Sequence, residues 1–290
     1  MILITGATGN FGKSAIDFLL KKNFPAGQIS ALVRDPAKAA DLSAKGVSLK
    51  TGDYNDYDSL VKAFQGVEKL LLVSSSDLND RSQQHLNAIK AAREASVKHI
   101  VYTSFQRKNE VSSPVQMISQ GHLDAEKAIL ESGTSYTILQ NGLYADILPW
   151  FMGEKVFETG IFLPGGTDKA AFTVRNDMAE AAANILIEDS HQNKIYLTAT
   201  NETNSFADVA RILSSISGKN VDYTDAPYGL FIEALTGAGV PEGIIGMIAG
   251  FSQAIKEGEF NFADNDLENL LHRKPTTLKD FLTAVYFPAS

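Results

Sequence analysis

Three glycines near the start of the chain point most directly to chemistry. Gly6, Gly9 and Gly12 follow a short apolar run, Ile2–Thr5, and open an amphipathic segment, Phe11–Lys22. In such a GxxGxxG loop the first glycine permits a tight turn, the second lets the backbone approach a pyrophosphate, and the third allows close packing of helix on strand. The helix N-terminus offers unpaired N–H groups to phosphate oxygens. The loop therefore predicts a dinucleotide site formed by Gly6, Ala7, Thr8, Gly9, Asn10, Phe11 and Gly12.

The residue after the second apolar run bears on which dinucleotide fits. An acidic residue there would bind a ribose 2′-hydroxyl, but Arg34 occupies this place, 22 positions after Gly12. A guanidinium can hold a 2′-phosphate with two hydrogen bonds and stack beside the adenine. We therefore predict NADPH rather than NADH as the cofactor. Two alternatives remain: Asp35 takes the acidic role, or Arg34 is a solvated loop charge.

Polar residues also follow the third and fourth apolar runs. Asp53 comes after the third run, where its carboxylate can reach the adenine amino group; the alternative is a helix cap. Ser74, Ser75 and Ser76 follow the fourth run, where small side chains let the ribose and phosphates pass closely. A plain serine turn is the alternative there.

The elements that must position these residues alternate regularly through the first half of the chain. Short, mostly apolar runs predict buried parallel strands at Ile2–Thr5, Ile29–Val33, Val47–Lys50, Leu70–Val73, His99–Ser104 and Tyr136–Leu139. Helical segments are expected between them at Phe11–Lys22, Pro36–Ala44, Asp58–Gln65, Arg81–Ala95 and Gly121–Glu131. In the fourth helix Leu86, Ile89, Ala92 and Arg93 lie at helical spacing. The alternation predicts an α/β fold, a Rossmann-type doubly wound parallel sheet.

The second half has a different pattern. The alternation stops near Leu143, and one more helix (Asn176–Glu188) and strand (Lys194–Thr198) are expected to return to the sheet. Further helices are expected at Ser205–Ser217, Tyr228–Leu235, Glu242–Ile255 and Thr277–Val285. We therefore divide the chain into an NAD(P)-binding Rossmann domain, residues 1–150, and a smaller, mostly helical substrate or lid region, residues 151–290, of which about 173–200 return to the sheet.

Composition excludes several classes of function. The chain has 290 residues, no cysteine and a formal charge of −8, so disulfides, thiolate metal sites and cysteine nucleophiles are absent, and a nucleic-acid surface is disfavoured. No basic segment precedes a long apolar stretch near its start, so we expect no secretory signal, and no apolar run reaches the length of a membrane span. We expect a cytoplasmic protein with neither nucleic acid nor membrane as partner.

Several motifs together resemble the atypical short-chain dehydrogenase/reductases of the NmrA-like group. They are Thr5-Gly6-Ala7-Thr8-Gly9, Val33-Arg34, Gly52-Asp53-Tyr54, Leu71-Leu72-Val73-Ser74 and Tyr102-Thr103-Ser104. Within that group, Gln140-Asn141-Gly142-Leu143-Tyr144 and Thr173-Val174-Arg175-Asn176-Asp177 look like bacterial NADPH:quinone oxidoreductase and triphenylmethane reductase. The similarity covers nearly the whole chain and implies an NADPH-dependent oxidoreductase.

The resemblance also implies further cofactor contacts. It assigns such roles to Asn141, Gly142, Leu143 and Arg175, and extends the expected site to Thr103, Ile138, Leu139 and Gln140. The chain departs from the family pattern at Gln140, where an Arg is usual, so a contact made by that Arg is lost or replaced.

The catalytic pair of ordinary short-chain reductases is absent. They use YxxxK, in which the Tyr protonates a carbonyl oxygen and the Lys lowers its pKa. Aligned on Glu126, the sequence has Ile118 at the Tyr position and His122 at the Lys position, so we assign no catalytic residue. The resemblance implies that His122 contacts the nicotinamide ribose; the alternative is a helix residue paired with Glu126. No metal site is expected, because His122 has no further ligand at suitable spacing.

Loss of the dyad narrows the range of acceptors. Reduction of a simple ketone leaves a strongly basic alkoxide that needs a positioned acid, whereas a hydroquinone resembles a phenol, with a pKa of about 10. Its anion can wait for a proton from water. We therefore expect hydride transfer to quinones or similar electron-poor conjugated acceptors. Phe105, Tyr144 and Trp150 could hold such a ring, the alternative being ordinary core packing.

Two rival functions remain at this stage. An acidic, cofactor-binding chain without an acid catalyst also suits a non-catalytic NADP(H) sensor of the NmrA type that acts on another protein. A sugar-nucleotide epimerase would need the missing Tyr. We expect a monomer or homodimer.

Overall fold

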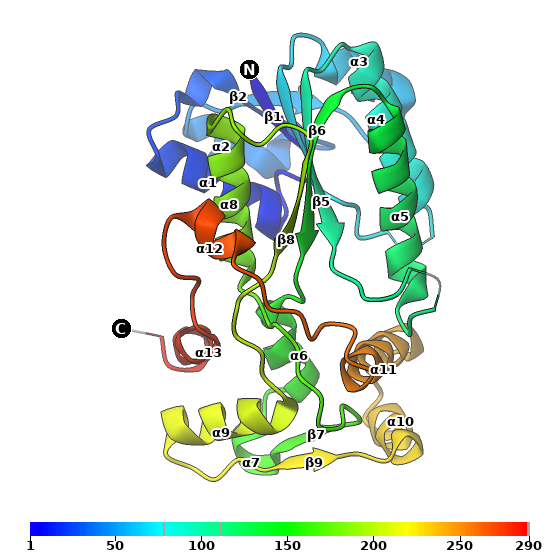
Figure 1. Cartoon of the computed structure of the whole chain (residues 1–290), viewed down its shortest axis with the longest axis vertical. Helices are drawn as coiled ribbons and strands as arrows, with labels where there is room; N and C mark the ends of the chain where they lie inside the picture. The colour runs from blue at the N-terminus through cyan, green and yellow to red at the C-terminus, as the bar shows by residue number, and fades with distance from the viewer. Residues whose placement is uncertain (78, 111, 289–290) are drawn as a thin grey trace.

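The computed structural model describes residues 1–77, 79–110 and 112–288, and its main feature is a seven-stranded parallel sheet (Figure 1). The strand order is β3-β2-β1-β4-β5-β6-β8. The strands are β1 (Ile2–Ile4), β2 (Ile29–Val33), β3 (Ser48–Thr51), β4 (Lys69–Leu72), β5 (His99–Phe105), β6 (Ser135–Asn141) and β8 (Lys194–Thr198). The prediction of a Rossmann-type doubly wound sheet is confirmed.

The alternation of side chains along β1 shows why the strands read as continuous apolar runs. Ile2 and Ile4 pack into one core, while Leu3 packs into the other on the opposite face, and all three are buried. A parallel strand covered on both faces needs apolar residues at every position.

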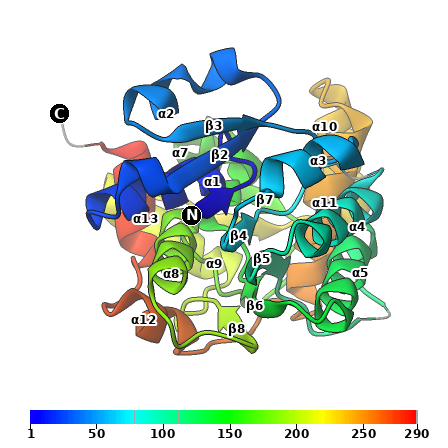
Figure 2. The same ribbon diagram turned by 90° about the horizontal axis from the view of Figure 1, so that it is seen from above.

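Helices cover both faces of the sheet, as the view from above shows (Figure 2). One face carries α1 (Asn10–Lys21), α2 (Ala40–Ala44), α8 (Arg175–Ile187) and α12 (Asp266–Leu271). The other carries α3 (Tyr57–Phe64), α4 (Arg81–Glu94) and α5 (Gln116–Glu131). The alanines of α8 are buried, and their small size lets this helix sit close to the sheet and to α1.

Some boundaries differ from those expected. Helix α5 begins at Gln116 rather than Gly121. Val115 is buried and Ile118 packs against a second hydrophobic core, described next, which holds this extra turn in place. The segment expected as one helix at Pro36–Ala44 is a 3₁₀ turn, Pro36–Ala39, followed by the single turn of α2.

The remaining elements form a second core beyond the carboxyl ends of the strands, at the bottom of Figure 1. Its helices are α6 (Leu148–Met152), α7 (Val156–Thr159), α9 (Phe206–Ser217), α10 (Tyr228–Gly237), α11 (Glu242–Lys256) and α13 (Leu278–Tyr286). A small parallel sheet joins β7 (Ile161–Leu163) to β9 (Tyr223–Asp225) and was not expected, because each strand has only three residues. Within the described ranges no helix is both long and apolar enough to cross a membrane.

Candidate active site

Two adjoining cavities lie along the carboxyl ends of the strands, where open α/β sheets bind their ligands. The first, of about 340 Å³, follows β1, β2, β3 and β4 and includes Arg34 and Asp53. The second, of about 650 Å³, lies beside β4, β5 and β6 and reaches α11. Residues 73–76, after β4, line both. We call them the cofactor cavity and the acceptor cavity.

The glycine loop connects β1 to α1 with a tight turn. Gly6 has a φ of +57°, which side chains disfavour, and the N–H of Gly9 donates to its carbonyl at 2.9 Å. A Cβ on Gly12 would lie 2.5 Å from the oxygen of Gly6, so only glycine lets α1 start here. In the described chain no side chain caps α1, which leaves N–H groups of its first turn for an anion. Gly6 and Thr8 line the cofactor cavity, while Asn10 and Phe11 line the acceptor cavity.

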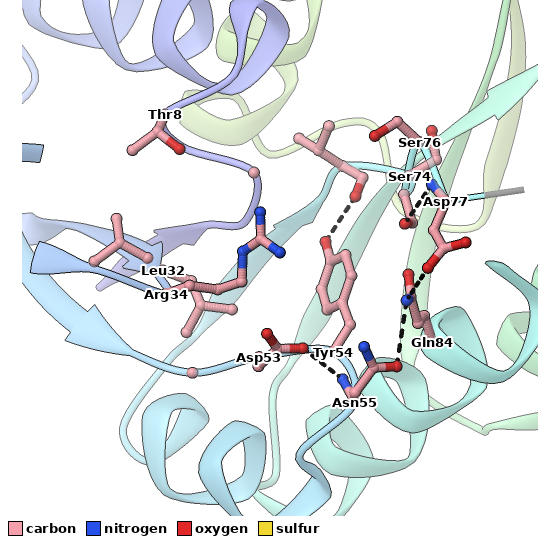
Figure 3. A pocket seen from close by; sticks show the side chains of 15 residues that line it. Thr8, Leu32, Arg34, Asp53, Tyr54, Asn55, Ser74, Ser76, Asp77 and Gln84 are labelled. Atoms are coloured by element: carbon pink, nitrogen blue, oxygen red, sulfur yellow. Dashed lines mark hydrogen bonds between the residues drawn. The ribbon is translucent and has the colours of Figure 1, made fainter. Parts of the chain in front are cut away.

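Arg34 extends from the end of β2 into the cofactor cavity (Figure 3). Its neighbour Asp35 is used elsewhere: its carboxylate accepts from the N–H of Ala37 at 3.0 Å and caps the 3₁₀ turn. Arg34 is therefore the charged group of this pair that lines the cavity, and its geometry suits a 2′-phosphate.

The other end of this cavity is built by the loop after β3 (Figure 3). Asp53 lines it and accepts from the N–H of Asn55 at 2.8 Å. The cap of α3 is Asp56, which accepts from the N–H of Ser59, so Asp53 is not a helix cap. The hydroxyl of Tyr54 lies 2.6 Å from both Thr5 Oγ1 and the carbonyl of Val73, and it ties the ends of three strands together.

Hydrogen bonds from its backbone fix the serine segment after β4, residues 74–76. The N–H of Ser74 donates to Thr103 Oγ1 at 2.8 Å, and the N–H of Ser75 donates to His85 Nε2 at 2.9 Å. Thr103 is buried and is not among the cavity-lining residues. It therefore positions Ser74 rather than reaching the cavity. Ser76 also lines both cavities.

A buried chain of three rings reaches from this segment to the acceptor cavity. Because a backbone N–H only donates, Nε2 of His85 carries no proton, and its Nδ1–H points to the carbonyl of Gly121 and the hydroxyl of Tyr102, both at 3.2 Å. The Tyr102 hydroxyl then donates to Nδ1 of His122 at 2.8 Å. Neutral His122 is thereby left with its proton on Nε2.

Burial keeps both imidazoles neutral. It lowers the pKa of His85 to about 4 and that of His122 well below 6.5, the latter assisted by the charges of Arg81 and Arg107. The pKa of Tyr102 is raised above its ordinary value, and burial is the largest cause. His122 lines the acceptor cavity and presents a neutral ring with an N–H there.

The alternative that His122 pairs with Glu126 is wrong. Glu126 instead forms an ion pair with Arg107 at 2.6 Å and accepts a hydrogen bond from Ser104. His122 stacks on Phe105, with ring centroids 5.9 Å apart.

Aromatic side chains give the acceptor cavity an apolar wall. Phe105 and Tyr144 line it as expected, and Phe251 of α11 lies edge-on to Phe105 at 6.4 Å. Ile118 also lines it, at the position where a reductase would carry its Tyr. Trp150 does not take part: it is 45% exposed and packs on Phe151.

The end of β6 supports this wall. Asn141 is buried, accepts from Thr198 and donates to the Tyr144 hydroxyl at 3.3 Å. Arg175 lies 4.8 Å from the centre of the Tyr144 ring. Of the other residues expected here, Gly142, Leu143 and Arg175 line the cavity, whereas Ile138, Leu139, Gln140 and Asn141 lie in β6 outside it.

Arg81, His85, Tyr102 and Phe251 escaped the sequence prediction. A signal was available for two of them: residues 81, 85, 88 and 92 share one face of α4, and that face is the buried one, whereas Arg93 is exposed. Polar residues on the core face of a helix mark functional candidates. Phe251 had no such signal, because a single Phe in an apolar helix is ordinary.

In the ranges that the structure describes, no cluster of His, Asp and Glu is suited to a metal.

The cofactor cavity fits a phosphorylated dinucleotide. The uncapped start of α1, the close glycine turn and Arg34 supply donors for a pyrophosphate and a 2′-phosphate. The residues that would hold NADPH are thus Gly6–Gly12, Arg34, Asp53 and Ser74–Ser76. Asn10, Phe11 and Ser74–Ser76 also line the acceptor cavity, so the two cavities are continuous along these residues.

Known proteins share both this fold and much of the sequence. The chain is 37% identical to quinone oxidoreductase 2 of Escherichia coli over 99% of both chains, and 32% identical to the NAD(P)H azoreductase of Xenophilus azovorans over 84% of this chain and 83% of that one. The structure of Citrobacter sp. triphenylmethane reductase with NADP(H) matches with a TM-score of 0.90 at 38% identity, covering 98% and 99% of the two chains. Residues 1–282 match the model of the NmrA-like family, and the chain belongs to that family.

Proposed function

We propose that the protein is an NADPH-dependent oxidoreductase that transfers hydride to quinones or similar electron-poor conjugated acceptors without a YxxxK dyad. The carrying observation is the pair of adjoining cavities: a polar one built for a dinucleotide opens beside an aromatic one that has Ile118 where an acid would stand. The named activities of the relatives, quinone, azo and triphenylmethane reduction, concern conjugated acceptors of this kind.

NADPH, when bound, supplies hydride from its nicotinamide ring. The residues of the chain supply position and surroundings: Phe105, Tyr144 and Phe251 present ring faces and edges to a planar acceptor, and His122 offers an N–H. Catalysis then rests mainly on proximity and orientation. A non-catalytic sensor is not favoured, because relatives at 32% and 37% identity are named for reductase activity.

NADPH oxidation in the presence of a simple quinone, of cyclohexanone and of no acceptor tests the proposal. We expect turnover with the quinone alone. Equal turnover of the ketone would show that an unrecognised acid replaces the Tyr. Tight NADPH binding with no turnover across a broad set of acceptors would instead favour the alternative function, a non-catalytic NADP(H) sensor.

We further propose the division of labour between residues 1–150 and 151–290, with the second part covering the acceptor. Met247 and Phe251 of α11 support it, since both line the acceptor cavity. We also propose a cytoplasmic location for the protein.

A further inference from the structure

Arg81 carries a buried charge that the described structure leaves without a partner. The residue is only 9% exposed, its Nε has no hydrogen-bond partner, and its guanidinium forms no ion pair with the described residues. Arginine keeps its charge in proteins, although burial lowers its pKa somewhat. Burying an unpaired charge costs free energy, so the position of Arg81 indicates that a negatively charged ligand or group pairs with it.

The packing of the Arg81 side chain against helix α5 fixes the position of this charge. The stem of Arg81 packs on Gly121 of α5, where a Cβ would lie 2.8 Å from Cδ and 2.9 Å from Cγ. Gly121 immediately precedes His122, and both Arg81 and His122 line the acceptor cavity. The glycine therefore makes room for the arginine beside the aromatic wall.

Asp77 acts on Arg81 electrostatically but forms no ion pair with it. The carboxylate of Asp77 instead accepts from the N–H of Asn79 at 2.9 Å and from the side chain of Gln84 at 3.0 Å. Arg81 is also absent from the lining of the cofactor cavity, where Arg34 lies. The partner that its position favours is thus a ligand in the acceptor cavity.

The reaction creates such a partner. When a quinone takes up a hydride, the C–H bond at the nicotinamide breaks, its electron pair goes to the acceptor, and the neutral quinone becomes a hydroquinone monoanion. Water later supplies the proton that completes the hydroquinone. The negative charge develops on an oxygen in a cavity that has Ile118 where the dyad Tyr would protonate it, and a fixed cation at low dielectric stabilises such a charge strongly.

We propose that Arg81 is the oxyanion-binding residue of the acceptor cavity and thereby makes quinones better acceptors than cationic dyes. This inference rests on the proposed function. A quinone goes from neutral to negative during reduction, whereas a cationic dye goes from positive to neutral. Arg81 favours the first change and opposes binding of the second acceptor, so the two acceptor classes respond to it with opposite sign.

The direct test uses 4-nitrophenol, a planar phenol whose anion is read by its absorbance, bound to the complex of protein and NADP⁺. We expect the pKa of the bound phenol to be lower in the wild-type protein than in Arg81→Met by an amount equivalent to about 10- to 150-fold in the preference for phenolate. Methionine keeps an unbranched stem over Gly121. The same pKa in both proteins, or failure of the wild-type complex to bind either form, would overturn the inference.

Kinetics supply the second readout. In Arg81→Met, kcat for a neutral quinone should fall about 10- to 150-fold, the affinity for NADPH should stay within about threefold, and a cationic triphenylmethane dye should inhibit quinone reduction more strongly. Arg93→Met, at the exposed end of α4, is the matched control and should behave as wild type. Equal losses for NADPH and quinone would assign Arg81 to the cofactor instead. A wild-type protein that reduces no acceptor would refute the proposed function, while the nitrophenol measurement would still judge Arg81.

Discussion

Arg34 lies at the end of β2 and lines the cofactor cavity, while the adjacent acid is occupied as a cap. We expect Arg34→Ala to weaken NADPH binding about 10- to 150-fold, because a charge-assisted contact of about 1.5–3 kcal/mol is lost. NADH, which has no 2′-phosphate, should bind nearly as before. Fluorescence titration with both dinucleotides measures the two affinities.

Lys38→Ala is the matched control, since it removes an exposed charge from the same loop. It should leave the preference for NADPH intact. Equal weakening of NADPH and NADH by Arg34→Ala would show that Arg34 does not hold a 2′-phosphate.

Tyr102 is the link that sets the proton position on His122 through a 2.8 Å hydrogen bond. In Tyr102→Phe this donor is lost, and the neutral ring of His122 becomes free to protonate either nitrogen. ¹⁵N NMR of labelled histidine should show a single Nε2–H form for His122 in the wild-type protein and a mixture in the variant. A single unchanged form in both would contradict the directed chain from His85.

At the scale of elements, the turn between β1 and α1 brings backbone N–H groups to the cofactor. A Cβ on Gly9 would lie 3.3 Å from the carbonyl oxygen of Gly6. In a glycine loop of this kind a branched side chain at the second glycine would occupy the space through which the pyrophosphate approaches the backbone. Gly9→Val should abolish NADPH binding, with loss of about 100-fold or more in affinity, while circular dichroism reports a folded chain.

Gly27→Ala provides the control, because a Cβ there meets nothing within 4 Å. NADPH affinity equal to wild type in Gly9→Val would remove the glycine loop from the site. Unfolding of that variant would be seen in its spectrum and would call for Gly9→Ala in its place.

At the scale of the whole molecule, buried histidines should make the fold sensitive to mild acid. Burial lowers the pKa of both His85 and His99 to about 4 from 6.5. Between these values the unfolded chain binds protons that the folded one excludes, so stability falls as pH drops below 6.5. From pH 7 to pH 5 the loss is about 2 kcal/mol for each histidine.

Urea unfolding at the two pH values measures this loss, and few carboxyl groups titrate in that window. His99, whose ring nitrogens lie 2.9 Å from the hydroxyls of Ser135 and Thr137 at the end of the sheet away from the site, offers a separable variant. His99→Asn should lessen the pH dependence without changing activity at pH 7. Equal stability at pH 7 and pH 5 in the wild-type protein would refute the prediction.

Features set by neighbouring residues were available from the sequence. The glycine spacing after Ile2–Thr5, the alternation of apolar runs with amphipathic segments, and the arginine after the second run all depend on local backbone geometry or on burial on both faces of a sheet. They predicted the fold class and placed Arg34 and the glycine loop, which line the two cavities. The absence of the dyad Tyr could also be predicted, because its position, held here by Ile118, is fixed by the spacing to His122 and Glu126 along one helix.

Contacts between distant segments were decided only by the tertiary structure. Arg81 and Gly121 are 40 positions apart, and only the packing of α4 on α5 shows that the glycine makes room for the arginine. Trp150 and Phe251 have similar apolar character in the sequence, yet one faces outward and the other faces the acceptor cavity. Such choices depend on how the second core packs beneath the sheet, because burial is a property of the assembled molecule and not of any one segment.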